Sequence, residues 1–390
     1  MDCWSIKKQC KLGRLMSMVD IKKPIRILHV LPGLTYCGGI EAYLLNYYRH
    51  IDRSKIQFDF ITHSRVEHEI KSEIESLGGR VFDWETFRIS RFFAIKKQIS
   101  TFFEEHKNEY SILHCHMANA AFLYFPLAKK AGIKHRILHS HNNRAAATFS
   151  HAIRNYPLLY IGNREATERI ACTEDAGKFL FGRYPFTVIK NSIDVNKFIY
   201  SLSMRTSMRE QLHLEKNFII GHVGRLDPQK NQSFLIKIFN AFYQKHPEAR
   251  LLMIGEGKDE TALKQLVQDL QLQHVVKFLG AKKNIEDYYQ AFDAFVFPSF
   301  YEGLGIVLVE AQCSGLPVFA SADVIPSDAR VSNLLTFIPL NNNEDCWEAA
   351  IEECVENRCV RKSPVEEIRK AGYDIRQEAK VLEHYYLSLR

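Results

Sequence analysis

Long hydrophobic runs, paired cysteines and sequence repeats are all missing from this sequence of 390 residues. No apolar stretch approaches the roughly 20 residues that a membrane-spanning helix needs. The first twenty residues carry four basic side chains and no apolar segment, so we expect no signal peptide there. The nine cysteines are odd in number and lack Cys-x-x-Cys spacing, which is typical of reduced thiols. These absences disfavour membrane-spanning, secreted and solenoid proteins and favour a cytoplasmic one.

Motifs that would announce a dinucleotide or a metal ion are missing as well. The glycine-rich loop at 32–39 does not follow the Gly-x-Gly-x-x-Gly pattern of dinucleotide-binding proteins. No Asp-x-Asp sequence occurs, the motif with which some transferases of another fold hold a metal ion. His114-Cys115-His116 could suggest metal ligands, but alternating residues of a buried strand point to opposite faces. We therefore predict no metal site and no cofactor.

What the sequence does have is the composition of a soluble globular protein, with 46% apolar and 25% charged residues. Its length suits two domains of about 150–200 residues each. The net charge of +7 suits an anionic partner such as a sugar nucleotide or a phospholipid headgroup. Because the basic residues are scattered and form no recognised module, we predict no nucleic-acid partner.

Short apolar strands alternate with helical stretches along most of the chain. The first predicted strand is Ile25–Leu31, and further candidates in the first half are 58–62, 80–84, 112–116, 136–141, 169–173 and 187–190. This alternation predicts parallel sheets with helices on both faces and ligands beyond the carboxyl ends of the strands. We place an interdomain linker at 196–216, which is charged and shows no clear strand.

The stretch from 297 to 318 carries the clearest ligand-binding pattern. A predicted strand at 294–297 leads into a loop with Gly303 and Gly305, and a helix is expected at Ile306–Cys313. Such a loop lets the backbone come close to a ligand, and the first N–H groups of the helix lie beside the positive end of its dipole. The pattern therefore predicts an anion site, with phosphate as the usual ligand.

Two carboxylates flank this loop. Glu302 lies in it, and Glu310 follows eight residues later, about one turn inside the helix. Eight helical residues rotate a side chain by only about 80°, so both carboxylates could reach one bound molecule. Carboxylates accept strong hydrogen bonds from sugar hydroxyls, whereas backbone amides suit a diphosphate. The alternative is an ordinary turn followed by a helix with a solvated glutamate.

Two other loops also join a predicted strand to a predicted helix. Gly38 and Gly39 precede a helix expected at 40–49, which gives a second helix N-terminus open to anions. In the second half, Arg225 and Lys230 lie on such a loop and could clamp a diphosphate. Taken alone, two basic residues in a loop are usually solvated.

These residues carry a family resemblance. Glu302-x7-Glu310 resembles the E-x7-E signature of retaining glycosyltransferases of the GT-B fold, in the family 4 group that includes many bacterial capsule and exopolysaccharide enzymes. Gly224, Arg225 and Lys230 match a second motif of that group. The resemblance covers nearly the whole chain, so it does not rest on one short motif.

The resemblance also implies a domain organisation. Asn191-Ser192-Ile193-Asp194 is similar to the family's Asn-Gly-[Ile/Val]-Asp motif at the end of the first domain. If the backbone there needs a positive φ, Ser192 carries strain, because glycine is the usual residue. We expect an α/β chain of two facing Rossmann-like domains, with parallel sheets and the active site in the interdomain cleft. The predicted segments are a poorly structured basic leader at 1–23, an acceptor domain at 24–200, a nucleotide-sugar domain at 201–375 and a C-terminal helix at 376–390 that crosses back to the first domain.

The implied activity is that of a retaining, metal-independent hexosyltransferase. It would move a sugar from a nucleoside-diphosphate sugar, with UDP the expected nucleotide, to a glycan or lipid-linked acceptor. The implied setting is capsule or exopolysaccharide biosynthesis, in the cytoplasm at the inner face of the membrane. Catalysis then consists mainly of stabilising the departing nucleoside diphosphate with positioned cations. The alternatives are a sugar-nucleotide epimerase of the same fold and a catalytically inactive scaffold subunit.

By the same resemblance, each candidate site residue receives a role. The second domain holds the donor through Glu310 on the ribose, Arg225 and Lys230 on the diphosphate, Gly280 beside the base, and Glu302, Gly303, Leu304, Gly305 and Ile306 on the sugar and its phosphate. In the first domain, Gly38 and Gly39 approach the donor phosphates or the acceptor. His141, at the end of a predicted strand, lies near the reacting sugar, with His139 as the alternative. For either histidine, a purely structural role is the plain alternative.

A basic amphipathic stretch at 88–107 has two interpretations. Its apolar residues recur at helical spacing, at Phe92, Ile95, Ile99 and Phe102. The first interpretation is a surface helix that packs this stripe on the sheet. The second is peripheral contact with an anionic membrane, where the basic side chains meet lipid headgroups.

Overall fold

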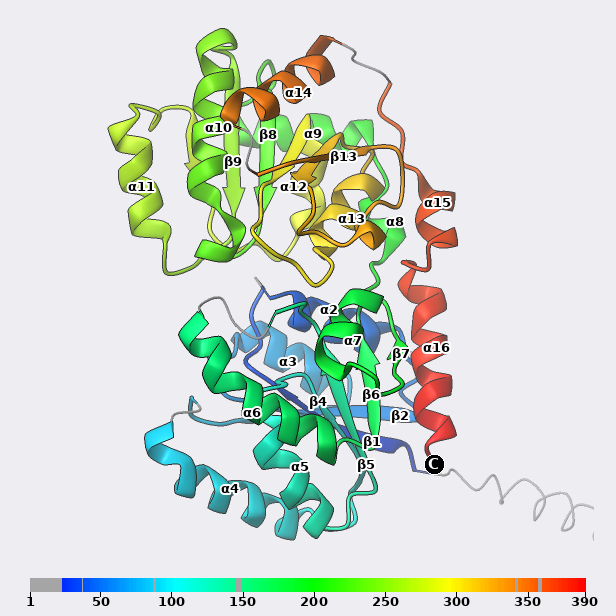
Figure 1. Ribbon diagram of the computed structural model, residues 1–390. Coiled ribbons are helices and arrows are strands. Elements are labelled where there is room, and N and C mark those ends of the chain that lie inside the picture. The colour runs from blue at the N-terminus through cyan, green and yellow to red at the C-terminus, as the bar shows by residue number, and fades with distance from the viewer. Residues whose placement is uncertain (1–22, 37, 87–88, 145–148, 341–342, 357–359) are drawn as a thin grey trace, which may run out of the picture.

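The computed structural model describes residues 23–36, 38–86, 89–144, 149–340, 343–356 and 360–390. The chain forms two α/β domains, stacked one above the other in Figure 1. The first is built on a seven-stranded sheet of order β3-β2-β1-β4-β5-β6-β7, and the second on a six-stranded sheet of order β10-β9-β8-β11-β12-β13. Neighbouring strands pair in parallel in both. The predicted pair of Rossmann-like domains is confirmed, while residues 1–22 of the predicted leader lie outside the described residues.

The first sheet follows the predicted strands closely, because most of them are short runs that contain β-branched or aromatic residues. Its strands are β1 (Ile25–Leu31), β2 (Ile56–Thr62), β3 (Arg80–Asp83), β4 (Tyr110–Cys115), β5 (His135–Ser140), β6 (Glu168–Ala171) and β7 (Thr187–Val188). The helices between them are α2 (Gly39–His50), α3 (His68–Ser76), α4 (Phe92–Glu105), α5 (Ala121–Lys130), α6 (Phe149–Glu165) and α7 (Glu174–Phe181), with a 3-10 turn at Ile89–Arg91.

The second sheet repeats the alternation. Its strands are β8 (Phe218–Val223), β9 (Ala249–Ile254), β10 (Val276–Phe278), β11 (Ala294–Phe297), β12 (Val318–Ser321) and β13 (Leu335–Ile338). The helices are α8 (Val195–Phe198), α9 (Leu202–Leu212), α10 (Gln232–Lys245), α11 (Glu260–Asp269), α12 (Ile285–Ala291), α13 (Ile306–Cys313), α14 (Glu344–Glu356), α15 (Val365–Lys370) and α16 (Ile375–Ser388), with 3-10 turns at Pro228–Lys230 and Ser327–Ala329.

The predicted linker at 196–216 contains no strand, as expected, but most of it is helical. It contains most of α8 and all of α9, and α9 packs on α12 of the second domain. Arg205 and Arg209 of α9 both form ion pairs with Asp293. The charged residues that suggested a solvated linker are therefore the ones that fasten α9 to the second domain.

The C-terminal helix α16 lies alongside the first domain and packs against α2 (Figure 1). Ile375, Leu382 and Tyr386 of α16 belong to the core under the first sheet. Lys55 reaches Glu383 at 2.9 Å, which adds an ion pair at the surface. The last helix thus buries its apolar side in the first domain, although it follows the second domain in the sequence.

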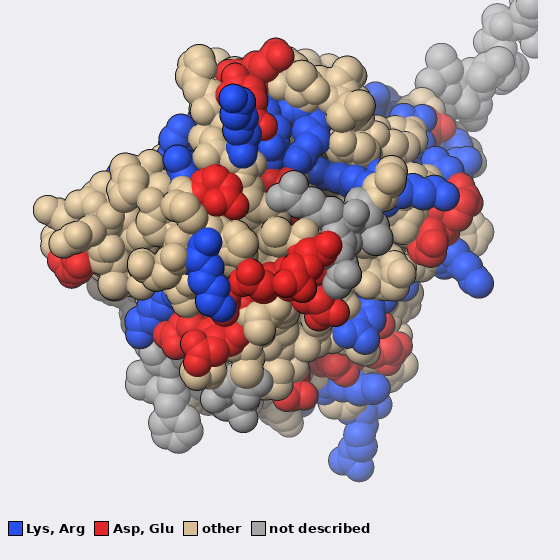
Figure 2. Space-filling view, turned by 90° about the horizontal axis from the view of Figure 1, so that it is seen from above, with Lys and Arg blue, Asp and Glu red and all other residues tan. Residues whose placement is uncertain are grey.

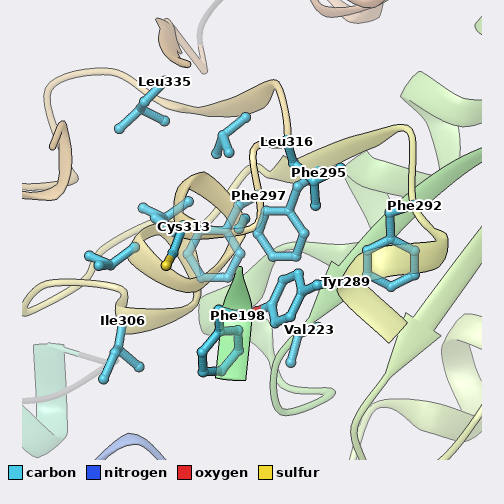
Figure 3. Close-up of a cluster of buried hydrophobic side chains, with 14 of the residues drawn as sticks. Phe198, Val223, Tyr289, Phe292, Phe295, Phe297, Ile306, Cys313, Leu316 and Leu335 are labelled. Carbon is cyan, nitrogen blue, oxygen red and sulfur yellow. The ribbon is translucent and has the colours of Figure 1, made fainter. Parts of the chain in front are cut away.

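A buried apolar cluster supports α13, the helix at the predicted anion site. Seven of the eight residues of α13 are buried. Figure 3 shows Phe295 and Phe297 of β11 and Tyr289 of α12 beside Cys313 of α13, and all four are at most 1% exposed. Because apolar side chains hold α13 on several sides, the position of its N-terminus is fixed by the core.

Ser192 carries no backbone strain, so that expectation is wrong. It is not among the residues with a positive φ in the described part of the chain. Its hydroxyl lies 3.3 Å from the carbonyl oxygens of Lys190 and of Gly372. The serine hydroxyl can therefore donate to a carbonyl at this junction, which glycine could not do.

The stripe of α4 packs inside the first domain. Ile95, Ile99 and Phe102 are buried, whereas Phe93 is 83% exposed. None of the helices that the structure describes is both long and apolar enough to cross a membrane. Figure 2 shows the end of the second domain, where basic and acidic side chains lie next to one another.

Candidate active site

The two domains touch at the carboxyl ends of their strands. Thr173, just after β6, donates its hydroxyl to the carbonyl of Gly303 in the second domain at 3.0 Å. A Cβ on Gly303 would lie only 1.9 Å from the carbonyl oxygen of His141, so only glycine fits there. Arg65, beyond β2, pairs with Glu256, beyond β9, at 3.3 Å. The structure therefore brings His141 and the loop before α13 together from opposite domains.

Lys230 and Glu302 form a buried ion pair beside this contact. Their Nζ and Oε1 atoms are 2.5 Å apart, and the side chains are 14% and 7% exposed. Ser299 donates its hydroxyl to the same carboxylate oxygen at 2.7 Å. The sequence assigned these two residues to different parts of a donor, and in the structure each neutralises the other.

Arg225 lies close by but is more exposed. Its guanidinium pairs with Asp227 at 3.2 Å, and its side chain is 55% exposed. The loop that carries it is tied to the loop before α13, because Gln229 donates to the carbonyl of Tyr301 at 2.9 Å. The backbone N–H of Phe300 donates in return to the carbonyl of Gln229 at 2.8 Å. The two predicted donor-binding loops therefore form one unit.

The N-terminus of α13 is shaped as the sequence predicted. Gly305 precedes the helix with φ 76°, a left-handed conformation that favours glycine. Leu304 and Ile306 are 2% and 7% exposed, and both side chains belong to the core. Since their side chains are buried, a ligand here can meet these two residues through the backbone alone.

Glu310 is buried and does not lie at the protein surface. The residue is 4% exposed, and Tyr289 of α12 donates its hydroxyl to Oε2 at 2.9 Å. Burial raises the pKa of the Glu310 carboxyl to about 7. Tyr289 was not predicted, since nothing in the local sequence distinguishes it from the neighbouring Tyr288.

Gly280 lies at the junction between β10 and the domain contact. Its φ is +70°, and its carbonyl accepts the N–H of Gly255 at 2.9 Å. The nearest atom to a Cβ there would be the carboxylate of Glu256 at 3.8 Å. The loop predicted to hold the base therefore lies next to the residue that pairs with Arg65 across the interface.

Glu41 occupies the second predicted anion site and was missed from the sequence. It lies in the first turn of α2 and is 9% exposed. A Cβ on Gly38 would lie 1.8 Å from its carboxylate, whereas one on Gly39 would meet nothing within 4 Å. Burial raises the pKa of Glu41 to about 7, although Arg225 of the facing domain acts in the opposite direction. An acidic residue in the first turn of a helix is usually explained by its interaction with the helix dipole, so Glu41 was not recognised as a site residue.

Five buried or half-buried histidines gather on one face of the first sheet, and this corrects the argument made about His114 and His116. Residues two apart in a strand share a face, so these two side chains lie together. They are joined by His29 of β1, by His139 of β5 and by His141 directly after β5. Two trios, listed in chain order as His29, His114, His116 and His116, His139, His141, have ring nitrogens within 4.8 Å of one another. The expectation that strand alternation separates them is wrong.

Two cavities lie near the domain contact. One of about 550 Å³ is lined by Arg65, Trp84, Arg91 and neighbouring residues beyond β2 and β3. The other, of about 250 Å³, is lined by Asp227, Phe300 and residues of α10 and α11. Neither is lined by the predicted catalytic residues His141, Arg225, Lys230 and Glu302, of which Lys230 and Glu302 contact each other.

Both halves of the chain match glycosyltransferase families. Residues 37–197 match the family described as Glycosyltransferase Family 4, and residues 203–372 match Glycosyl transferases group 1. EpsF of Bacillus subtilis, named as a glycosyltransferase, is 31% identical over 370 residues, covering 93% of this chain and 96% of EpsF. The Escherichia coli UDP-Gal:alpha-D-GlcNAc-diphosphoundecaprenol alpha-1,3-galactosyltransferase is 28% identical over 238 residues, covering 58% and 62%.

Solved structures agree with the fold. Anabaena HepE in complex with UDP-glucose superposes with a TM-score of 0.76 at 21% identity, covering 93% of this chain and 100% of that one. WaaG, a glycosyltransferase involved in lipopolysaccharide biosynthesis, gives 0.65 at 14% identity, covering 92% and 94%. With matched domains in both halves and one relative matched over almost its whole length, the chain belongs to the glycosyltransferases of the GT-B fold.

Proposed function

We propose that the protein is a retaining glycosyltransferase that moves a sugar from a UDP-sugar to a glycan or lipid-linked acceptor in capsule or exopolysaccharide assembly. The name of the Escherichia coli relative gives UDP-Gal as its donor, and HepE was solved with UDP-glucose. That relative's name also gives a diphosphoundecaprenol-linked acceptor, which supports a lipid-linked acceptor here.

The observation that carries the proposal is the buried Lys230–Glu302 pair. Two opposite charges are held 2.5 Å apart, one on each of two loops that meet the facing domain. A buried pair contributes little to stability compared with a well-packed apolar pair, so its presence suits a binding role. A bound diphosphate would replace Glu302 as the ion-pair partner of Lys230. The carboxylate of Glu302 would then accept hydrogen bonds from the sugar.

The chemistry follows from charge and position. When the bond between the sugar and the diphosphate breaks, negative charge grows on the leaving oxygen. Lys230, Arg225 and the N-terminus of α13 supply positive charge there without a metal ion or a cofactor. Burial lowers the pKa of His141 to about 3, so His141 acts as a neutral hydrogen-bonding group and not as an acid. The first domain presents the acceptor on the same face of the sugar, and the anomeric configuration is retained.

The acceptor reaches the enzyme at the inner face of the membrane. α4 contacts that surface through Phe93, which is 83% exposed, and through the exposed Lys96 and Lys97. Since the apolar stripe of α4 packs in the core, the contact is peripheral and mainly electrostatic.

Two alternatives predict different behaviour. A sugar-nucleotide epimerase of the same fold would interconvert the free donor without an acceptor. A scaffold subunit would bind no donor at all. The intact Lys230–Glu302 pair favours a binding site over a scaffold, and an acceptor-dependent product separates a transferase from an epimerase.

The first experiment measures thermal unfolding of the purified protein with UDP, GDP, ADP, CMP and their common sugars. A ligand that binds only the folded protein at a hundredfold excess over Kd adds about 2.7 kcal/mol to its stability. We expect a selective upward shift with UDP and a UDP-sugar, lost in Lys230→Ala. Lys237→Ala is the matched control, because Lys237 is an exposed lysine of α10 seven residues further on. No shift with any nucleotide would favour the scaffold.

Product analysis completes the test. A UDP-sugar whose anomeric linkage is α should give an α-linked product, identified by proton NMR, and transfer should persist in EDTA. A β-linked product would refute retention, and loss of transfer in EDTA that a divalent cation restores would refute metal independence.

A further inference from the structure

The five histidines on the face of the first sheet are ordered into two short hydrogen-bonded chains. In the first, His29 Nδ1 lies 3.0 Å from His116 Nε2, and His116 Nδ1 lies 2.8 Å from His141 Nε2. In the second, the hydroxyl of Tyr386 in α16 lies 2.6 Å from His114 Nδ1, and His114 Nε2 lies 3.1 Å from His139 Nδ1. The two chains touch where the rings of His139 and His141 stack with centroids 3.9 Å apart.

All five imidazoles are neutral in the folded protein. Burial is the first cause that lowers the pKa of each, and neighbouring histidines lower four of them further. No carboxylate is among the causes of any of these shifts. A neutral imidazole has one N–H donor and one bare nitrogen, so each chain must run in a single direction.

Tyr386 sets the direction of the second chain. A phenol hydrogen is best placed when the hydroxyl donates to His114 Nδ1, which fits the short 2.6 Å separation. His114 then carries its hydrogen on Nε2 and donates to His139 Nδ1. The reverse direction would leave the phenol hydrogen without a partner. In either direction His139 Nε2 is buried with no partner among the described residues, and in the direction chosen here it carries the hydrogen of His139.

The surroundings of its two ends set the direction of the first chain. Among the described residues His29 Nε2 is buried without a hydrogen-bond partner, and the ring packs against Phe58 and Phe60 with centroids 4.3 and 5.5 Å away. An unpaired N–H in such surroundings is rarer in proteins than an unpaired acceptor. At the other end, His141 Nδ1 is also buried and has no partner among the described residues, but His141 as a whole is only partly buried and lies at the domain contact. The hydrogens are therefore better placed pointing from His29 toward His141.

We propose that His116 is a positioning residue: its Nδ1–H occupies Nε2 of His141, which keeps the hydrogen of His141 on Nδ1 and offers substrate a neutral donor. His29 fixes His116 in the same way from the other side. The step that involves substrate rests on the proposed function, because only a bound sugar or phosphate oxygen would accept from Nδ1. The hydrogen positions do not depend on that function.

Nitrogen NMR of full-length protein labelled with 15N-histidine tests the hydrogen positions directly, since protonated and bare ring nitrogens have well-separated shifts. The signals of His141 are assigned by their loss in His141→Gln. We expect the hydrogen of His141 on Nδ1 in the unmodified protein. A hydrogen on Nε2 of His141 would overturn the proposal whatever the enzyme transfers.

Two substitutions at His116 separate hydrogen bonding from packing. His116→Asn keeps an N–H donor where Nδ1 stood, whereas His116→Leu fills the space without one. We expect His116→Asn to retain the tautomer of His141 and kcat within about threefold, and His116→Leu to lose the tautomer and lower kcat about 10- to 100-fold. The KM for the donor should change little, because Lys230 and the α13 loop are untouched.

The control is His63→Asn, which alters another buried histidine, one whose Nε2 lies 2.6 Å from the hydroxyl of Tyr124. It should leave the signals of His141 unchanged. If His116→Leu fails to fold, the spectra of the unmodified protein and of His116→Asn still show whether the hydrogen of His141 lies on Nδ1. If the tautomer behaves as expected but no transfer is found with any donor, the positioning role stands and the proposed function fails.

A metal ion would give a different result. Either histidine trio could offer it three neutral ring nitrogens, a ligand set that zinc accepts. A stoichiometric metal in the purified protein, whose removal shifts the histidine nitrogens, would overturn the proposal because the ring lone pairs would then bind metal. Elemental analysis before and after dialysis against EDTA gives this answer.

Discussion

Replacing Lys230 by methionine should destabilise the fold and remove donor binding, and the size of the first effect can be worked from the structure. The replacement keeps the length of the side chain and removes its charge. Glu302, 7% exposed, then keeps only Ser299 as a hydrogen-bond partner among the contacts that the structure describes. Breaking a fully buried pair on one side costs about 3–5 kcal/mol, so a pair with this residual exposure should cost about 3 kcal/mol.

The double variant Lys230→Met/Glu302→Gln distinguishes this reason from simple loss of packing. With both charges gone, no uncompensated charge is buried, and the double variant should lose only about 1 kcal/mol. The two single effects would then fail to add by several kcal/mol, as expected for residues in direct contact. Urea unfolding of the four proteins gives the free energies. Single losses below about 0.5 kcal/mol, or additive losses, would refute the buried pair.

Glu302→Gln alone should affect donor binding in the opposite direction from Lys230→Met. It frees Lys230 from its partner, so the affinity for UDP should stay the same or rise while stability falls. Transfer should drop, because the amide is a weaker acceptor for sugar hydroxyls than the carboxylate. Isothermal titration with UDP beside a transfer assay checks both. Weaker UDP binding in Glu302→Gln would show that Glu302 does not compete with the diphosphate for Lys230.

Three further outcomes are expected elsewhere in the molecule. Burial raises the pKa of Glu310 from 4.5 to about 7, so the folded protein should lose about 3 kcal/mol of stability as pH rises between these values. Urea unfolding at pH 5 and at pH 8 should show this loss, and the loss should be smaller in Glu310→Gln. Gly303→Ala should lower kcat/KM at least tenfold with little change in thermal midpoint, because its Cβ would meet the carbonyl of His141 at 1.9 Å and hold the domains apart; normal kinetics would contradict that contact. Lys96→Glu with Lys97→Glu should weaken sedimentation with anionic vesicles, and unchanged binding would exclude α4 as the contact.

The strands and the donor loops could be predicted because their signals are local. A run such as Ile25–Leu31 is rich in β-branched and apolar residues, and Gly305 before Ile306–Cys313 marks a helix start. The helix α9 escaped prediction for the opposite reason. Its arginines looked solvated because their shared partner, Asp293, lies more than eighty residues further along the sequence. Local charge does not reveal a distant partner, so a fastened helix looked like a linker.

The pairings within the site also depend on the order of the strands. Lys230 and Glu302 are 72 residues apart and meet because β8 and β11 are neighbours in the second sheet. The chemistry of each residue could be predicted from the sequence, but its partner could not. Glu41 was missed because its burial depends on Gly38 and on the facing domain, which only the folded chain brings close.

The histidine cluster shows what a register argument could have added. His29 of β1 pairs in register with His114 of β4, and His114 pairs with Ile137 of β5. Side chains alternate along a strand, so His116, two residues beyond His114, and His139, two residues beyond Ile137, share the face of His29. A slip of one residue between β4 and β5 would send His139 to the opposite face, so His114 would lose its partner His139 and His116 its partner His141. A His-x-His pair at the ends of two adjacent strands is therefore better interpreted as one shared layer than as two alternating faces. The position of His141 therefore depends on the register between β4 and β5, because that register places the histidines that contact it.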